Sequence, residues 1–148
     1  MAVFSVGMVL RIVLLMSMTV SVWFVFNAHV QDMKAVQREI VMEDITKEVQ
    51  EIVLNAIMIT RNNQTYYESR VSLPNLEREY RISAQCRNNN TVMILATVLG
   101  SSENFTASDN LNCSGLSFNG ELSPGETCIK AQNNGTWSIT LGGYCASV

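Results

Sequence analysis

Residues 2–26 read AVFSVGMVLRIVLLMSMTVSVWFVF, and this apolar segment decides the fold of the 148-residue chain. Arg11 is its single charged residue. The segment is long enough to cross a hydrocarbon core, which takes about 20 apolar residues in a helix. A helix that is apolar nearly all round is stable only in lipid or among other helices. The segment therefore predicts a membrane helix or an assembly helix.

Three interpretations compete for this segment. A cleaved signal peptide fits poorly, because Phe26 stands where a small residue should precede the best cleavage point. A membrane-spanning helix fits the length, although Arg11 costs about 3 kcal/mol unless it snorkels or pairs. The third interpretation, a retained helix packed against copies of itself as in a filament core, is the one we favour. The expected assembly residues are Val3, Val9, Ile12, Leu15, Val20, Phe24 and Phe26.

The helix is expected to continue well beyond the apolar segment. From Gln31 to Thr60 the sequence has no Gly or Pro, and apolar residues recur at alternating spacings of three and four. This period indicates an amphipathic helix with one apolar stripe. The stripe comprises Met42, Ile45, Val49, Ile52, Ala56 and Ile59, widened by Val36, Val41, Val53 and Ile57. A helix of about 58 residues would be about 90 Å long, so part of the stripe needs a partner besides the chain's own β domain.

The pattern of the remaining chain is that of β-strands. Tyr80–Arg87 alternates apolar and polar residues, as in a half-buried strand, and Thr91–Leu99 is typical of a central strand. Asn119-Gly120 predicts a tight hairpin between short strands on either side, and Gln132–Gly135 predicts a second hairpin. We expect five to seven short antiparallel strands, in a small sandwich or in a sheet wrapped on the C-terminal half of the helix.

The predicted fold class is therefore α+β, with a long N-terminal helix and a C-terminal antiparallel β-sandwich-like domain. The helix is assigned to residues 1–60, of which 1–30 are apolar and 31–60 amphipathic, and the β domain to residues 61–148.

Cysteine usage indicates an oxidising compartment. All four cysteines lie in the C-terminal half at wide spacings, without the close pairs of a zinc or iron–sulfur site. An even number in a small domain beyond an apolar segment predicts two disulfides, with three possible connectivities. Our preferred pairing joins Cys113 to Cys128 and Cys86 to Cys145.

Sequons for N-linked glycosylation agree with this compartment. Five N-x-[ST] triplets follow the apolar segment and none precedes it, which predicts a glycosylated domain outside the cytoplasm. The acceptor residues are Asn63, Asn89, Asn104, Asn112 and Asn134.

Neither catalysis nor nucleic-acid binding is expected. His29 is the only histidine and follows the apolar segment, so the β domain has no histidine base. No phosphate-binding, zinc-protease or calcium-loop motif occurs, so no cofactor or metal is predicted. The net charge of −3 and the lack of a basic run argue against nucleic acid as a partner.

The architecture resembles that of type IV pilin-like proteins, the archaeal pilins and archaellins in particular. The likeness lies in the apolar helix half (Val3–Phe26), the amphipathic half (Val36–Ile59) and the sequon-rich β domain that begins near Leu73-Pro74. It implies a homo-oligomeric extracellular filament, with apolar helices bundled in the core and glycosylated β domains outside. It also implies a subunit that is held in the membrane before assembly.

Two other functions remain open. One is a single-pass membrane-anchored accessory or stator subunit of a surface machine, facing outside the cytoplasm. The other is a secreted or anchored domain that binds a small ligand in a pocket lined by Tyr66, Tyr67, Trp137 or Tyr144.

Overall fold

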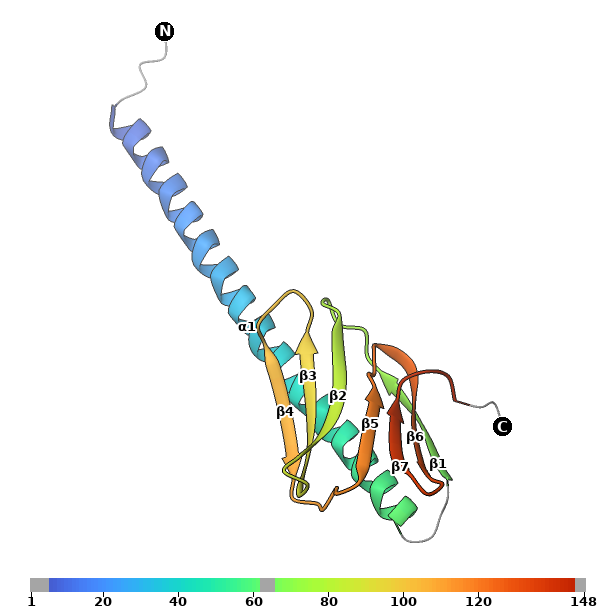
Figure 1. The fold of residues 1–148 in the computed structure, drawn as a ribbon. Helices are drawn as coiled ribbons and strands as arrows, with labels where there is room; N and C mark the ends of the chain where they lie inside the picture. Colours follow the sequence, from blue (N-terminus) through green and yellow to red (C-terminus); the bar gives the residue numbers. More distant parts are fainter. Residues whose placement is uncertain (1–5, 62–65, 146–148) are drawn as a thin grey trace. The chain divides into compact units, whose positions relative to one another are not determined.

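The computed structural model describes residues 6–61 and 66–145. Within these ranges one helix, α1 (Val6–Arg61), precedes seven strands (Figure 1). The strands are β1 (Tyr66–Leu73), β2 (Tyr80–Arg87), β3 (Thr91–Val98), β4 (Asn104–Asp109), β5 (Leu116–Gly120), β6 (Gly125–Asn133) and β7 (Trp137–Leu141). The α+β fold class expected from the sequence is confirmed.

The chain divides into two compact units, and the boundary between Ile40 and Val41 lies inside α1. In the first unit, the described residues form helix alone. The second unit contains the rest of α1 together with the strands, because the helix has buried side chains only from Met42 onward.

The packed face of α1 largely follows the predicted stripe. Ile52 and Ile59 are only half-buried, and Val36 and Val41 are exposed. Two threonines lie on the packed face instead, where the Thr46 and Thr60 hydroxyls donate to main-chain carbonyls one turn earlier at 2.6 and 2.7 Å. Such back-bonding satisfies a buried hydroxyl without another partner. The buried helical residues are Met42, Ile45, Thr46, Val49, Val53, Ala56, Ile57 and Thr60.

The strands form two sheets in the second unit. One has the order β2-β3-β4 and is antiparallel; the other has the order β1-β6-β7-β5, in which β5 pairs parallel with β7. An isolated bridge joins the sheets, with hydrogen bonds of 2.9 and 2.8 Å between the backbones of Ile82 and Leu122. Figure 1 shows the strands side by side with the C-terminal half of α1 behind them. This arrangement matches the expected sheet wrapped on the helix.

A single hydrophobic core lies between this layer and the helix. Each sheet turns one face inward; in β3, for example, Val92, Ile94, Ala96 and Val98 are buried while the alternate residues are half-buried. The helical residues Val49, Val53 and Ile57 belong to the same core cluster as residues of both sheets. The β domain therefore has no complete core without the second half of α1.

The hairpin predicted at Asn119-Gly120 is wrong. These two residues end β5, which pairs with β7, and the chain continues to Leu122 at the bridge to β2. Gly120 has a φ of +82°, and a Cβ atom there would collide with the carbonyl oxygen of Leu141. The glycine thus permits close approach of two strand backbones instead of a reverse turn. The second predicted hairpin is present, between β6 and β7.

The preferred disulfide pairing is also wrong. The structure joins Cys86 to Cys113 and Cys128 to Cys145. The crossover between the sheets passes the end of β2, where the amide of Cys113 donates to the carbonyl of Asn89 at 2.9 Å. After β7 the chain turns back over β6, and the amide of Gly142 donates to the carbonyl of Cys128 at 2.9 Å. Each bridge therefore joins a strand to a segment that backbone contacts already hold beside it.

Candidate functional site

Most of the exposed large apolar side chains of the described residues lie in the apolar segment, which the structure describes from Val6 to Phe26. None of its most apolar 18-residue window is buried, and its length and composition are sufficient for a membrane span. Six of the predicted assembly residues lie in this segment and have exposed side chains: Val9, Ile12, Leu15, Val20, Phe24 and Phe26. Val3 lies outside the described residues.

Hydroxyl groups in the apolar segment are satisfied within the helix itself. Ser17, Thr19 and Ser21 donate to the carbonyl oxygens of Leu14, Leu15 and Ser17 at 2.7–2.8 Å. An unsatisfied hydroxyl is costly in hydrocarbon, and this bonding removes that cost. Arg11 is exposed and is the one charged side chain of the segment. The surface of the apolar segment is thus suited to lipid or to other apolar helices along nearly the whole length of the segment.

The four described sequon asparagines are all exposed. Asn89 lies in the turn after β2, Asn112 in the crossover after β4, and Asn134 in the loop after β6. Figure 1 shows these three connections at the end of the second unit where α1 terminates, whereas Asn104 begins β4 at the other end. Asn63 lies outside the described residues. Three of the four described sequons therefore lie at the end of the second unit where α1 terminates.

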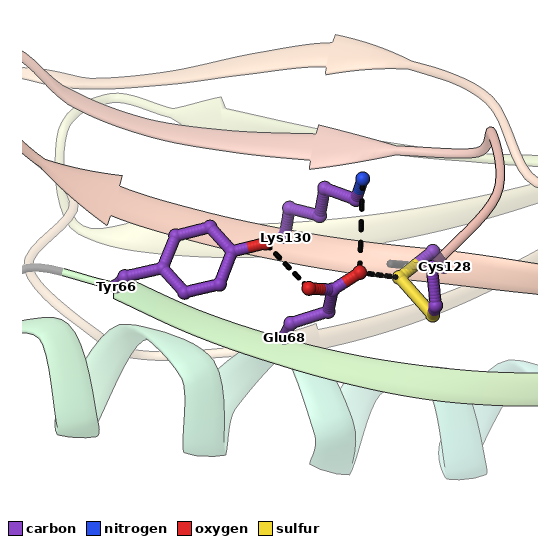
Figure 2. A network of polar contacts seen from close by, with 5 residues as sticks. Tyr66, Glu68, Cys128 and Lys130 are labelled. Carbon is purple, nitrogen blue, oxygen red and sulfur yellow. Dashed lines mark hydrogen bonds and ion pairs between the residues drawn. A yellow bond between two sulfur atoms is a disulfide. The ribbon is translucent and has the colours of Figure 1, made fainter. Parts of the chain in front are cut away.

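A network of polar side chains surrounds one disulfide on the outer face of β1 and β6 (Figure 2). Glu68 and Lys130 are cross-strand partners, and their charged groups lie 3.6 Å apart. The Tyr66 hydroxyl donates to the second carboxylate oxygen of Glu68 at 2.5 Å. The first carboxylate oxygen lies 3.2 Å from Sγ of Cys128. A disulfide sulfur has no hydrogen to donate, so this last contact is a close approach of a negative charge to the bridge.

The Glu68 carboxylate also affects Tyr66. The hydrogen bond to Glu68 and its negative charge raise the pKa of Tyr66, because the phenolate would lie beside an existing anion. No sequence pattern indicates this network, because Tyr66 and Lys130 are 64 residues apart. Only the register of β1 with β6 brings Tyr66, Glu68 and Lys130 together.

A metal site at this network is excluded in the oxidised protein. The possible ligand atoms of Glu68, Cys128 and Cys145 lie within 4.8 Å of one another. Metal binding by cysteine requires thiolates, and both sulfurs are bonded to each other. The two sulfur atoms lie close together because they form the disulfide.

One cavity of the second unit lies away from the four aromatic residues that were considered for a ligand pocket. This cavity of about 340 Å³ is lined by Asn75, Leu76, Glu79, Tyr80, Arg81, Leu99, Ser123 and Pro124. None of the four expected aromatic residues lines it. Trp137 is half-buried and donates from Nε1 to Oγ1 of Thr60 at 2.9 Å, which ties β7 to the end of α1, while Tyr144 is 92% exposed.

Comparisons with protein-family models, with curated proteins and with solved structures gave no match. The features of the molecule that bear on its function are therefore the surface of α1, the disulfides and the placement of the sequons. An exposed apolar helix of this length is compatible with a membrane-anchored protein or with a filament subunit, and two disulfides fit a location outside the cytoplasm.

Proposed function

We propose that this chain is a structural subunit of an extracellular helical filament similar to a type IV pilus. The apolar segment holds the subunit in the membrane before assembly. On assembly it exchanges lipid for the apolar segments of neighbouring copies. The β domain, stapled by its disulfides and carrying N-linked glycans, forms the outer surface.

The observation that carries the proposal is the contrast between the two halves of one helix. From Met42 to Thr60 α1 buries a face against its own strands, whereas the Val6–Phe26 region has no buried residue in its apolar window. The helix is continuous between them. The second half of the helix therefore completes the core of the β domain, and the first half offers an apolar surface to lipid or to neighbouring copies.

The distribution of apolar side chains around the apolar segment also favours a polymer over a closed oligomer. Apolar side chains surround the helix in the apolar segment, so one copy presents several faces to its neighbours. Contacts between different faces of identical subunits propagate into a helical assembly unless the rotation closes. Arg11 is then placed where a carboxylate of a neighbouring copy or water reaches it, since a lone charge is costly in either environment.

The alternative is a single-pass accessory or stator subunit whose apolar segment stays in lipid. The same exposed helix supports it. The two functions differ in stoichiometry: a filament subunit occurs as repeated copies with residues 6–26 covered by neighbours, whereas an accessory subunit keeps these residues in lipid.

Electron microscopy of material sheared from the cell surface, combined with mass spectrometry of the N-terminus, tests the proposal. We expect filaments composed mainly of this chain, with the apolar segment present in the assembled subunit. Intact protein confined to the membrane fraction, with no polymer in the sheared material, would overturn the filament function and leave the accessory subunit.

A further inference from the structure

An ordered apolar stripe continues beyond the apolar segment. Val22, Phe26, His29, Met33, Val36 and Ile40 follow one another at spacings of four, three, four, three and four. We call these six residues the seam. Between residues 2 and 26 nearly every position is apolar, so periodicity carries no information there. From residue 27 to 40 polar residues predominate, and the heptad spacing of Met33, Val36 and Ile40 stands out against them.

The seam is not an extension of the face that packs on the β domain. The buried residues Met42, Val49 and Ala56 follow one another at spacings of seven, and neither Val36 nor Ile40 belongs to that series. Positions that continue the packed face toward the N-terminus hold small or polar residues, such as Gln31 and Ala35. The seam is thus a second and separate apolar face.

Side chains of the seam are exposed in the single chain. Met33 is 53% exposed, and Val36 and Ile40 are each 55% exposed. A shallow hollow on the helix surface, lined by Ser21, Val22, Val25, Phe26 and His29, lies along the first part of the seam. Knobs at heptad spacing with hollows between them are the complement of another helix with the same spacing.

We propose that the seam binds the seam of a second copy of this chain, in a parallel two-helix contact that extends from the apolar segment to Ile40. This proposal rests on the proposed function and adds the residues and the orientation of one contact between subunits. Copies that insert into one membrane share one orientation, so contacts that begin in the apolar segment continue in parallel. Beyond Ile40 the next two seam positions are Glu43 and Lys47, which end the contact.

Charges beside the seam also favour the parallel orientation. Asp32 and Glu39 flank it on one side, and Val30 and Gln37 flank it on the other. In a parallel pair, flanking positions from opposite sides meet, so Asp32 lies across from the uncharged Gln37 of the second copy. In an antiparallel pair, equal sides meet and the two acidic residues oppose one another. His29 faces His29 of the second copy, and a single polar pair within an apolar seam fixes the register at a cost in stability.

Cysteine cross-linking of the full-length protein on intact cells, where membrane-inserted and assembled subunits are both present, tests the contact. The four native cysteines are all in disulfides, so Val36→Cys introduces one free thiol. Ala35→Cys is the matched control, because it is adjacent, is also exposed, and lies off the seam. Under mild oxidation we expect the covalent dimer to form several-fold more from Val36→Cys than from Ala35→Cys.

Two further substitutions distinguish specific binding through the seam from random collision of two copies. Ile40→Glu added to Val36→Cys should reduce the dimer to the level of the control, because it buries a charge in the contact. His29→Leu added to Val36→Cys should raise the yield, because it removes the polar pair. Both positions are exposed in the single chain, so neither substitution removes a packing contact within it.

Equal cross-linking at positions 35 and 36, or cross-linking of Val36→Cys to a different polypeptide, would overturn the proposal. If filaments nevertheless form, the proposed function stands and only the seam fails. If the protein stays monomeric and no filament is found, both fail.

Discussion

Tyr80 is the largest fully buried side chain of the second unit, with 1% of its surface exposed. Its hydroxyl donates to the carbonyl oxygen of Pro74 at 2.8 Å. Burial raises the pKa of Tyr80 to about 12, because the phenolate would lose its hydration. The folded state therefore keeps a proton that the unfolded chain releases above pH about 10. The contribution of Tyr80 to stability is complete below that pH and is lost as the pH rises through about 12.

We expect Tyr80→Phe to flatten the alkaline loss of stability. At neutral pH the substitution should cost about 1 kcal/mol for the lost hydrogen bond. Between pH 10 and about 12 the free energy of unfolding should fall less steeply in Tyr80→Phe than in the wild type. Tyr144→Phe, at an exposed position, is the control and should keep the wild-type slope. Equal slopes for all three proteins would contradict the assignment.

Glu68 and Lys130 are expected to act in opposite directions on the reduction of the Cys128–Cys145 disulfide. Reduction creates a thiolate at Cys128 beside the Glu68 carboxylate, which disfavours it, whereas the Lys130 ammonium and the cross-strand residue Arg70 favour it. Glu68→Gln should therefore speed reduction by dithiothreitol, and Lys130→Gln should slow it.

The Cys86–Cys113 disulfide serves as the internal control, because neither substitution lies beside it. Mass spectrometry after timed alkylation follows both bridges in one sample. If the substitutions only loosened the structure, the Cys128–Cys145 disulfide would be reduced faster in both variants. Faster reduction in Lys130→Gln would therefore refute the electrostatic explanation.

Gly120 and Gly135 offer a matched test of the bridge between the sheets. Both have positive φ, +82° and +88°, so alanine costs about 1–2 kcal/mol of backbone strain at either site. Only at Gly120 would the new Cβ also collide with the Leu141 carbonyl, whereas nothing lies near it at Gly135. We expect Gly120→Ala to destabilise the fold clearly more than Gly135→Ala in denaturant unfolding. Equal losses would mean that β5 does not run this close to the end of β7.

At the scale of elements, the second half of α1 was predictable because one period dominates the stretch from Gln31 to Thr60, which has no Gly or Pro. Its two faces were harder to separate: the sequence placed Val36 and Val41 with Val49, although Val36 and Val41 are exposed and Thr46 and Thr60 are buried. A threonine that bonds its own helix backbone behaves as a small apolar residue, which hydrophobicity patterns do not register. The same patterns do not show which of two apolar faces meets the β domain.

Strand pairing was the least predictable part of the fold. The Asn119-Gly120 pair has the sequence of a hairpin turn, but long-range contact of β5 with β7 decides its role. The disulfides depend on the same long-range order, since Cys113 lies in the crossover between sheets and Cys145 in the segment that returns over β6. Local sequence establishes that four cysteines form bridges, but their partners follow from topology.

The difference between the two faces of α1 predicts different costs of truncation. Ile57 is fully buried, so Ile57→Ala should destabilise the second unit by about 3 kcal/mol. Ile40 is 55% exposed, and Ile40→Ala should change the stability of the monomer by less than about 0.5 kcal/mol. Denaturant unfolding in detergent at low protein concentration measures both. A large loss for Ile40→Ala in the monomer would contradict the placement of the seam.

On the scale of the whole molecule, the sequence was sufficient to find an exposed apolar segment of membrane-span length but not the clustering of the sequons. Ile12, Leu15 and Phe24, which were predicted to be assembly residues, are exposed in the part of α1 whose apolar window has no buried residue. Three described sequons share one end of the second unit because the turns after β2, β4 and β6 meet there. That clustering depends on strand direction and could not be read from the spacing of Asn89, Asn112 and Asn134.

We propose that copies of this chain cover one another's apolar segments. The most direct test is a single free cysteine at Val20→Cys, probed with maleimide in detergent-free material sheared from the cell surface. We predict that this thiol is protected in material that sediments as filaments and becomes reactive once detergent separates the subunits. Val20→Cys protein found only in the membrane fraction, soluble as monomers on mild extraction and absent from sheared material, would contradict the account.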